Sequence, residues 1–467
     1  YYTFGHEDRS KQNTLAEILD FGHTEEIRNS WLNKRFVSVG YYALVDFSKV
    51  NPTPDPFSDR AEWFDLKDLP PMIFDHREMI DKALAIGPTE QHQLVIIGAG
   101  AAGHASAVSA RQNGVKDVII LEKQSYIGGN GMLAAGGMSA AQSLTQATKG
   151  YNDSKESWYQ DTMKGGRNIN NPELVRTLTE NGSAGVDWLQ AMGADLSSAA
   201  RAGGHNAERL HRPDGGAKSG PEIIRTLKDT AKKLGVETRL NSKVIQLVQD
   251  KEGRITGVLV QGKHSKLHVL GAKAVIIASG GFARNNELVA KYRPDLKGVD
   301  ATNNPGNVGD ALTFATKVGA ATVDIKEIQA FPTAAAGKMV ISETARGAGA
   351  IMLNNQGKRF CNELDTRDKV SACVWSQTNK EAWLVFDETV LDRLGQLRGM
   401  LDLGLIFKGG TASEISKLSG MDAQSFEQSI NRYNDFKVKG NDDDFGRKNM
   451  ADDIKYPIYV VKVKPAV

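Results

Sequence analysis

The chain has 467 residues, with 58 Lys or Arg against 56 Asp or Glu, and its formal net charge at pH 7 is +2. This length allows about two to four domains with a large buried core. The near-neutral balance excludes recruitment to nucleic acid or to an anionic membrane by global charge. Two cysteines, Cys361 and Cys373, are too few to ligate an iron–sulfur cluster, and the sequence has no motif for covalent haem attachment. Any electron transfer therefore has to use an organic cofactor.

Glycine is the informative excess, with 47 residues or about 10 % of the chain against a usual ~7 %, and it predicts nucleotide-binding turns. No apolar run approaches the ~18 residues of a membrane span, and the first residues do not resemble a signal peptide. We expect a cytoplasmic protein, or a periplasmic one if the native N-terminus is missing. The chain starts at Tyr1 without Met and stops soon after Ile458–Val463, an expected strand, so we expect it to be a fragment.

The aromatic- and proline-rich first 85 residues are expected to contain a strand from Val37 to Phe47 and a helix from about His76 to Ala85. A resemblance to the latter half of a Nudix hydrolase domain rests on four motifs, Tyr2–Gly5, Val37–Val45, Glu62–Phe64 and Leu69–Pro71. The glutamate-rich helix that holds Mg²⁺ against a pyrophosphate in such enzymes is absent. We expect residues 1–85 to be a partial, catalytically dead Nudix-like segment, with a Nudix-type pyrophosphate hydrolase fusion as the less favoured alternative. The polar residues 86–93 are expected to form a linker.

A βαβ pattern begins directly after this linker, with an apolar strand at Leu94–Ile97, a helix to about Asn113 and a second strand at Val118–Leu121. The turn Gly98–Gly103 has the G-x-G-x-x-G spacing of a dinucleotide site. Its first glycine allows the tight turn, its second lets the backbone approach a pyrophosphate, and its third allows close packing of the helix on the strand. The alternative is a glycine turn in an unrelated α/β protein.

A carboxylate follows at the place where a dinucleotide-binding fold binds a ribose. Glu122 ends the second strand, 19 residues after Gly103 (122 − 103 = 19). This pattern does not by itself separate FAD from NAD. The cofactor-binding residues predicted in this first unit are Gly98, Gly100, Ala102, Gly103, Glu122 and Lys123.

Three further groups of small residues follow in order along the chain. They are Gly128-Gly129-Asn130 with Ala134-Ala135-Gly136-Gly137, then Ala278-Ser279-Gly280-Gly281-Phe282, and Asn304-Pro305-Gly306-Asn307-Val308-Gly309-Asp310-Ala311. On these motifs, the chain from about residue 92 to its end resembles the flavoprotein subunits of the fumarate reductase/succinate dehydrogenase family, and within it the soluble fumarate and urocanate reductases. Physically, each group is a turn whose backbone N–H groups can reach a flat or anionic ligand.

The resemblance implies that the cofactor is FAD. It implies cofactor binding by Gly129, Asn130, Ala135, Gly136, Gly137, Ala278, Ser279, Gly280, Gly281, Asn304, Gly309 and Asp310. Membrane-bound members attach FAD through a histidine beside the first of these groups. Because the sequence has no histidine between His104 and His205, we expect the FAD to be non-covalent.

The implied fold class is α/β. A doubly wound, Rossmann-like FAD-binding domain carries an inserted α+β capping (clamp) domain, and the partial Nudix-like α/β segment precedes them. The expected boundaries are 94–326 for the FAD-binding domain, 327–452 for the capping domain, and 453–467 for a truncated return to the FAD-binding domain.

The segment that begins at Phe331 resembles the family's capping domain, which closes over the flavin and supplies a proton donor. The resemblance implies that Arg367 protonates a substrate carbon and that Glu343 and Arg346 reprotonate Arg367, whereas Arg359 is expected to be structural. A guanidinium with a pKa above ~12 is a poor acid by itself. A second arginine and a closed site destabilise its charge, and Glu343 can resupply the proton. Without the resemblance, Arg367 between two aspartates would be interpreted as an ordinary surface ion pair.

The predicted substrate-binding residues are Phe331, Ser342, His211 and Arg212. Fumarate reducers of the family place a histidine where this chain has Phe331, and they use another histidine nearer the C-terminus, whereas the last histidine here is His268. An unpaired carboxylate facing a phenyl ring is costly, so we expect a substrate with an apolar or aromatic substituent. The alternative is that Phe331 only packs, in a reductase whose substrate lies slightly differently.

The sequence therefore predicts an FAD-dependent oxidoreductase that reduces the C=C bond of an α,β-unsaturated carboxylate, with hydride from flavin N5 and a proton from Arg367. It predicts a fragment that lacks the C-terminal part of the site. The expected partners are a small unsaturated carboxylate and an external electron donor, such as a reduced flavin, a quinol or a redox protein. No metal site is predicted. The alternative is a non-catalytic flavin-binding remnant.

Overall fold

The computed structural model of the chain describes residues 87–201, 205–263, 266–336, 339–450 and 452–467. The Nudix-like segment predicted at residues 1–85, with its expected strand and helix, lies outside the described residues. Within the described part, the chain forms two six-stranded sheets and one three-stranded sheet. No helix in this part has the length and apolar character of a membrane span.

The first sheet has the strand order β6-β2-β1-β9-β8-β7. Its strands are β1 (Pro88–Ile97), β2 (Val118–Leu121), β6 (Glu237–Arg239), β7 (Lys243–Gln249), β8 (Ile255–Gln261) and β9 (Leu267–Ile277). β1 runs parallel to β2 and β9, and β2 runs parallel to β6, whereas β7, β8 and β9 pair antiparallel. All four residues of β2 are buried, as in a parallel strand covered on both faces. The helix α6 (Ala101–Gln112) joins β1 to β2, which confirms the predicted βαβ unit.

Strand β1 is longer than the sequence indicates. Its outer half starts at Pro88 and pairs with β9 through His92, opposite Ala272. The linker predicted at 86–93 is therefore wrong for residues 88–93. Because these residues are polar and mostly exposed, no alternation of apolar residues marks them as a strand, and pairing with the long neighbour β9 determines their conformation.

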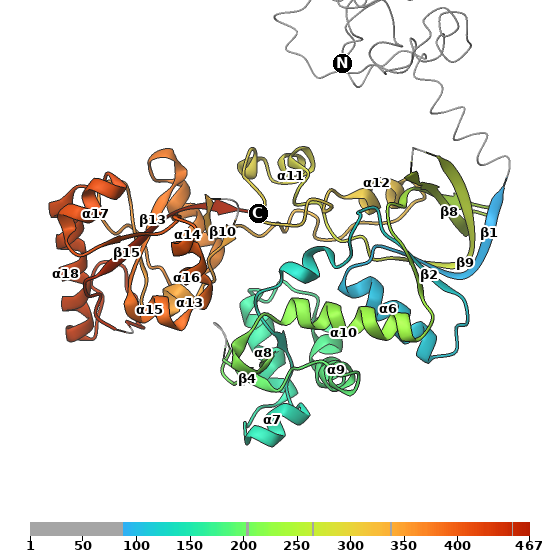
Figure 1. Cartoon of the computed structure of the whole chain (residues 1–467), viewed down its shortest axis with the longest axis horizontal. Helices are drawn as coiled ribbons and strands as arrows, with labels where there is room; N and C mark the ends of the chain where they lie inside the picture. Colours follow the sequence, from blue (N-terminus) through green and yellow to red (C-terminus); the bar gives the residue numbers. More distant parts are fainter. Residues whose placement is uncertain (1–86, 202–204, 264–265, 337–338, 451) are drawn as a thin grey trace, which may run out of the picture. The chain divides into compact units, whose positions relative to one another are not determined.

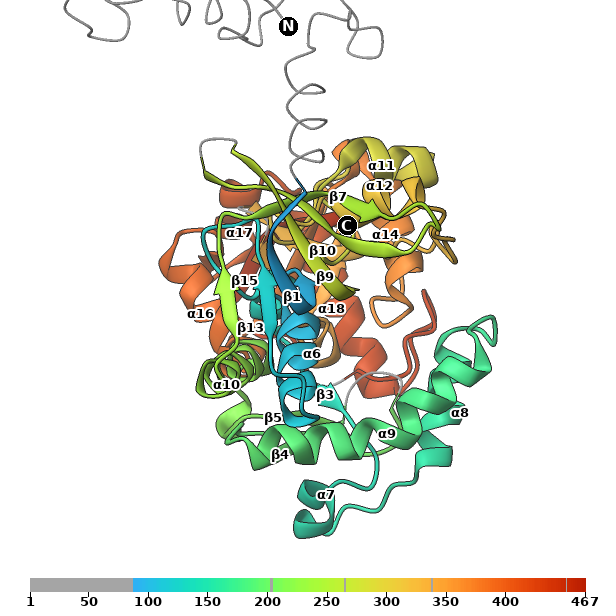
Figure 2. The same cartoon turned by 90° about the vertical axis from the view of Figure 1, so that its right-hand side faces the viewer.

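Helices cover this sheet on both faces. On one face, α6 lies against β1 and β2, and α10 (Ser219–Lys233) lies beside α6 (Figure 1, Figure 2). Their apolar side chains share one buried cluster with those of the two strands. On the other face, Phe314 of α12 (Asp310–Lys317) packs against the alternate residues of the same two strands. The loops at the carboxyl ends of β1, β2 and β9 are left to form a ligand site.

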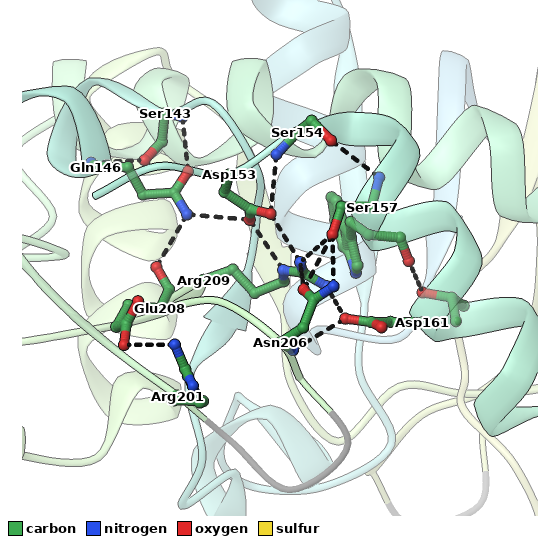
Figure 3. Close-up of polar contacts among 12 residues, drawn as sticks. Ser143, Gln146, Asp153, Ser154, Ser157, Asp161, Arg201, Asn206, Glu208 and Arg209 are labelled. Carbon is green, nitrogen blue, oxygen red and sulfur yellow. Dashed lines mark hydrogen bonds and ion pairs between the residues drawn. The ribbon is translucent and has the colours of Figure 1, made fainter. Parts of the chain in front are cut away.

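A helical region follows β2. It contains η2 (Gly129–Leu133), β3 (Met138–Ser139), α7 (Leu144–Lys149), α8 (Lys155–Gly165), α9 (Pro172–Ala191), β4 (Ser198–Ala200), β5 (Leu210–Arg212) and η3 (Asp214–Gly216). The fully buried Arg209 holds this region together. Its guanidinium donates to Asp153, which precedes α8, and to Asp161, which lies on α8, at 2.7 Å each (Figure 3). A buried cation needs such partners, and this one fastens the start of β5 to α8.

The second sheet has the order β11-β10-β15-β13-β12, with β14 beside β15. Its strands are β10 (Phe331–Ala335), β11 (Met339–Val340), β12 (Ile351–Leu353), β13 (Ala382–Asp387), β14 (Phe407–Gly409) and β15 (Ile458–Ala466). The helices of this part are α13 (Thr344–Gly347), α14 (Arg367–Trp375), η7 (Thr378–Lys380), α15 (Glu388–Arg393), α16 (Gly395–Asp402), α17 (Ala412–Ser419) and α18 (Ala423–Lys439). Two short helices, α11 (Asn286–Tyr292) and η5 (Pro294–Leu296), come between the two sheets in the sequence.

The predicted strand near the end of the chain is confirmed, but its predicted place is wrong. Strand β15 lies in the middle of the second sheet, between β10 and β13, and is not a return to the FAD-binding domain. Its residues are apolar on both faces, as a central strand requires: Ile458 and Val460 join one apolar cluster, and Val461 and Val463 join another. This pattern does not specify which sheet the strand joins. The last residue, Val467, does turn back, and its carbonyl accepts the N–H of Thr302 at 2.9 Å.

Candidate active site

The turn between β1 and α6 is shaped by three glycines. Gly98 has a left-handed φ of +107°, and a Cβ there would lie 2.6 Å from the carbonyl oxygen of Ala278. A Cβ on Gly103 would lie 1.9 Å from the carbonyl oxygen of Gly98, so only glycine lets α6 approach the end of β1 this closely. At Gly100 the nearest atom to a Cβ would be the oxygen of Gly128, at 3.9 Å. The turn is thus closely packed at two positions and open at Gly100.

A cavity opens at this turn, at the carboxyl ends of β1, β2 and β9. Ligands of open α/β sheets bind at this place. The predicted cofactor residues that line the cavity are Gly98, Gly100, Ala102, Glu122, Lys123, Gly129, Asn130, Ala278, Ser279, Gly280, Asn304 and Asp310. The motifs that are far apart in the sequence are therefore brought together around one cavity.

Two charged residues at the end of β2 line the cavity. Glu122 is 9 % exposed, and its two carboxylate oxygens accept the backbone N–H groups of Ala99 at 2.9 Å and Gln124 at 2.8 Å. These bonds fix the carboxylate and leave lone pairs free for a hydroxyl ligand. The ammonium of Lys123 forms an ion pair with Asp310 at the start of α12, which joins two walls of the cavity.

A second cavity adjoins the first and shares Tyr126, Gly129 and Asn304 with it. Exposed apolar side chains line it, among them Tyr126, Met132 and Leu133. The Asn130 side chain joins its walls, because it donates to Asn303 at 2.7 Å and accepts the N–H of Asn304 at 2.7 Å. An apolar surface with a polar rim suits a flat, mostly apolar ring.

The guanidinium of Arg367, the first residue of α14, has three neighbours. Its Nε donates to Glu343 Oε2 at 2.6 Å, and its Nη1 donates to Gln329 Oε1 at 2.6 Å. Its Cζ lies 5.2 Å from the centroid of the Phe331 ring. The Arg367 side chain is 38 % exposed and that of Glu343 is 41 % exposed, so the pair is oriented by its contacts and remains accessible to a small ligand.

Arg346 on α13 interacts electrostatically with this pair and is 3 % exposed. Its Nη1 donates to the carbonyl oxygen of Glu363 at 2.6 Å, while its buried Nε has no hydrogen-bond partner among the described residues. Burial lowers the pKa of Arg346, although the charge of Glu343 opposes this shift. Burial alone would raise the pKa of Glu343, but the hydrogen bond and charge of Arg367, together with the charge of Arg346, hold that pKa below its usual value. The structure therefore brings all three predicted catalytic residues together.

Comparison with known proteins identifies the family. Residues 93–467 match a family model described as an FAD binding domain. The chain is 39 % identical over 419 residues to the probable fumarate reductase Ifc3 of Shewanella frigidimarina, covering 89 % of this chain and 70 % of the relative. It is 42 % identical over 387 residues to a fumarate reductase (cytochrome) of the same species, covering 82 % and 68 %. A solved structure, the open conformation of a flavocytochrome c3 fumarate reductase, has a TM-score of 0.75 at 39 % identity and covers 90 % of this chain and 73 % of its own.

The chain belongs to the flavoprotein fumarate reductase family. Its α/β FAD-binding fold and FAD as its cofactor, both predicted from the sequence, are confirmed, and the protein is an FAD-dependent oxidoreductase. The comparisons give no support to the Nudix-like interpretation of residues 1–85.

The residues of the first cavity fit FAD. The Ser279 hydroxyl is buried at the cavity without a hydrogen-bond partner among the described residues, which leaves it for a ligand oxygen. The open space at Gly100 lies at the N-terminus of α6, where backbone N–H groups favour a pyrophosphate. Both features would be unexplained in a turn that only packs.

Six predicted cofactor residues are not among the residues that line either cavity in the described structure, namely Gly103, Ala135, Gly136, Gly137, Gly281 and Gly309. They build the turns instead. Gly103 allows the close packing that the sequence predicted. The carbonyls of Ala135 and Gly136 accept bonds from Arg212 and Ser219, and the carbonyl of Gly281 accepts the N–H of Gly309. A Cβ on Gly137 would lie 2.4 Å from the carbonyl oxygen of His211.

The structure argues against one of the predicted substrate residues, His211. His211 is fully buried in β5, and its ring nitrogens are hydrogen-bonded to Ser143 Oγ at 2.6 Å and to the backbone carbonyls of Met138 and Arg209. Burial also lowers the pKa of His211. The prediction of substrate binding by His211 is therefore wrong, because both nitrogens are used within the fold. Arg212 and Ser342 make local contacts, to the Ala135 carbonyl and to the Thr344 hydroxyl, and Arg212 Nε has no hydrogen-bond partner among the described residues. Their role in substrate binding stays a prediction.

Sequence reasoning misses several residues of the two sites. Ser242 and Lys243 line the first cavity, and this polar pair at the start of strand β7 could have been found from its place at a strand end. Gln329 contacts Arg367 across 38 residues of sequence, and no local pattern signals that contact.

Proposed function

We propose that this FAD-dependent oxidoreductase reduces the C=C bond of an α,β-unsaturated carboxylate and that Arg367 protonates the substrate carbon. The observation that carries this proposal is the 2.6 Å contact between Arg367 Nε and Glu343 Oε2, together with the electrostatic interaction of the buried Arg346 with both of them. An ordinary surface ion pair has no need of a second, buried arginine. An external electron donor, such as a reduced flavin, a quinol or a redox protein, completes the reaction.

Residues 88–326 serve as the FAD-binding domain in this proposal, and the capping domain begins at residue 327 and includes strand β15. Gly100, Glu122 and Ser279 hold the dinucleotide part of FAD, and the adjoining cavity with Tyr126 and Met132 holds its ring system without a covalent bond. When bound and reduced, FAD supplies a hydride for one alkene carbon.

The proton for the other alkene carbon comes from residues of the chain. Arg367 donates a guanidinium proton as carbanion character develops on that carbon. Before this transfer the Arg367 charge keeps Glu343 ionised, since it holds the pKa of that carboxyl low. Once Arg367 is neutral, this effect disappears and Glu343 takes up a proton more readily. Glu343 is partly exposed, so it can take that proton from water and return it to Arg367.

Phe331 gives the substrate site an apolar face. Its ring lies against the Arg367 guanidinium, so a substrate that reaches Arg367 also meets the phenyl group. The phenyl ring offers a second carboxylate no hydrogen bond, and desolvating a charge against it costs several kcal/mol. The preferred substrate is therefore a monocarboxylate with an apolar or aromatic substituent, such as an acrylate or a cinnamate.

The test is reduction of unsaturated acids by the full chain with FAD, with a reduced viologen dye as electron donor. We expect dye oxidation that depends on an unsaturated acid, and a flavin spectrum that leaves the protein on denaturation. Arg367→Ala should retain FAD and lose dye oxidation. The matched control is Arg393→Ala, which removes a comparably exposed arginine that pairs with Asp452 at 2.8 Å. A protein that binds FAD but oxidises the dye with none of these acids would contradict the proposal.

A further inference from the structure

A network of buried charges adjoins Arg346. Glu363 and Arg447 are fully buried. The Glu363 carboxylate accepts two bonds from Arg359, at 3.0 and 2.9 Å, and one from Arg447, at 3.1 Å. Arg359 also donates to Asp442 at 2.9 Å. Two arginines and two carboxylates thus form one connected, desolvated cluster.

Arg447 and Glu363 each join this cluster to Arg346, and Arg447 also reaches Ala350. Arg447 Nη2 donates to the carbonyl oxygen of Arg346 at 2.8 Å, and Arg447 Nη1 donates to the carbonyl oxygen of Ala350 at 3.0 Å. The carbonyl oxygen of Glu363 accepts a hydrogen bond from Arg346 Nη1 at 2.6 Å. Arg346 is therefore held at its backbone and at the end of its side chain. The same short helix, α13, has Glu343 as its N-cap residue. The positions of Glu343 and Arg346, the two residues predicted to reprotonate Arg367, therefore both depend on this helix.

The cluster holds Arg346 without giving it a hydrogen bond to a carboxylate, although the charge of Glu363 acts on Arg346 across space. The carboxylates of Glu363 and Asp442 hydrogen-bond to Arg359 and Arg447, while Arg346 receives only a neutral carbonyl from the cluster. A buried cation with a neutral acceptor gives up a proton more readily than a solvated one. Arg346 thus differs from Arg359 and Arg447, which both hydrogen-bond directly to a carboxylate of the cluster.

We propose that Arg447, held by Glu363, is a positioning residue that fixes Arg346 and α13 for proton delivery to Arg367. This inference rests on the proposed function and deepens it. Arg447 acts only through Arg346 and has no role on the substrate itself. Arg359 binds the same Glu363 carboxylate but is a structural arginine, because its hydrogen bonds go to Glu363 and Asp442 and none goes to α13.

Arg447→Lys and Arg359→Lys form a matched pair of variants, since each shortens one buried arginine and keeps its charge. Both are made in the full chain with FAD. Amide hydrogen exchange of peptides that cover α13 is measured by mass spectrometry, alongside kcat, KM and Tm. We expect Arg447→Lys to speed exchange in α13 and to lower kcat about 10- to 100-fold with KM nearly unchanged, because a small displacement of a positioned group costs this much. Arg359→Lys should lower Tm comparably and change α13 exchange and kcat much less than Arg447→Lys does, because Arg359 reaches α13 only through Glu363.

The outcomes separate this inference from the proposed function. Normal α13 exchange and kcat in Arg447→Lys, with Arg367→Ala inactive, would overturn the inference alone. Full activity of Arg367→Ala would overturn the assigned proton donor, whatever Arg447→Lys does. If Arg447→Lys does not fold, Glu363→Gln replaces it, since this change keeps the side-chain shape and the main-chain carbonyl that binds Arg346. Faster exchange in α13 then supports the inference, and unchanged exchange overturns it.

Discussion

The proposed FAD cavity and the proposed proton-delivery site are built by different means. The cavity is made mostly of backbone and small residues in the turns after β1, β2 and β9, so each part corresponds to a short sequence motif. The proton-delivery site is made of long charged side chains from distant segments: Arg367 contacts Glu343 across 24 residues of sequence, and Arg447 contacts Arg346 across 101. The cofactor site can therefore be predicted from short stretches of sequence, whereas the proposed proton-delivery site depends on how the capping part packs.

The largest expected effect separates the two sites. Arg367→Ala removes a positioned proton donor, and we expect kcat to fall by ~10²–10⁴-fold or more. FAD affinity should be unchanged, because Arg367 is not among the residues that line the two described cavities. Steady-state dye oxidation and a flavin titration of the same preparation test both statements. Near-normal turnover would exclude Arg367 as the donor, and loss of FAD would mean that the two sites are not independent.

The next largest effects are expected from two substitutions in the glycine turn, one of which affects FAD binding and the other stability. Gly100→Ala adds a methyl group to the open side of the turn, so we expect unchanged stability without FAD and FAD affinity about tenfold weaker or more. Gly103→Ala adds a methyl group 1.9 Å from a carbonyl oxygen, and we expect a loss of about 1–3 kcal/mol of unfolding free energy by overpacking. Urea denaturation without FAD and a flavin titration distinguish these outcomes. Equal behaviour of the two variants would show that Gly100 does not face the cofactor.

The same contrast explains how far the sequence could be interpreted. The unit from β1 to β2 and its glycine turn follow from local periodicity and spacing. The place of β15 does not, because a strand that is apolar on both faces fits the middle of either sheet. The role of His211 does not either, since its partners Ser143 and Met138 are 68 and 73 residues away. The Glu363–Arg447 contact spans 84 residues, and only the packed fold reveals it.

Phe331 is the residue expected to determine which unsaturated acid the enzyme prefers. We expect the wild type to prefer an aryl or alkyl acrylate to fumarate in kcat/KM, and Phe331→His to shift this ratio toward fumarate by about tenfold or more. A hydrogen bond to a charged group is worth ~1.5–3 kcal/mol, which sets this scale. Phe331→Leu is the control, because it keeps an apolar face and should keep the preference. Fumarate as the best wild-type substrate, with no change in Phe331→His, would return Phe331 to a packing role.

The smallest effect concerns stability in acid. The pKa of Glu343 in the folded chain lies below its ordinary value of 4.5, so in acid the unfolded chain binds a proton at this group before the folded one does. The stabilisation from Glu343 is therefore fully present above about pH 4.5, and it is lost as the pH falls through the lowered folded pKa. Because both partners of the ion pair are partly exposed, we expect a contribution of at most ~1 kcal/mol.

Glu343→Gln removes this titrating group, and Gln329→Leu removes the other hydrogen bond to Arg367 while leaving the titration in place. Urea unfolding, followed by the fluorescence of the six tryptophans, gives the unfolding free energy at pH 7 and at pH 3.5. The difference between wild type and Glu343→Gln should shrink at the lower pH, whereas that between wild type and Gln329→Leu should stay constant. A constant difference for Glu343→Gln would mean that the carboxylate is not stabilised by its two arginines. In that case the ion pair would add nothing to the capping part beyond its geometry, and the electrostatic argument for the relay would lose its support.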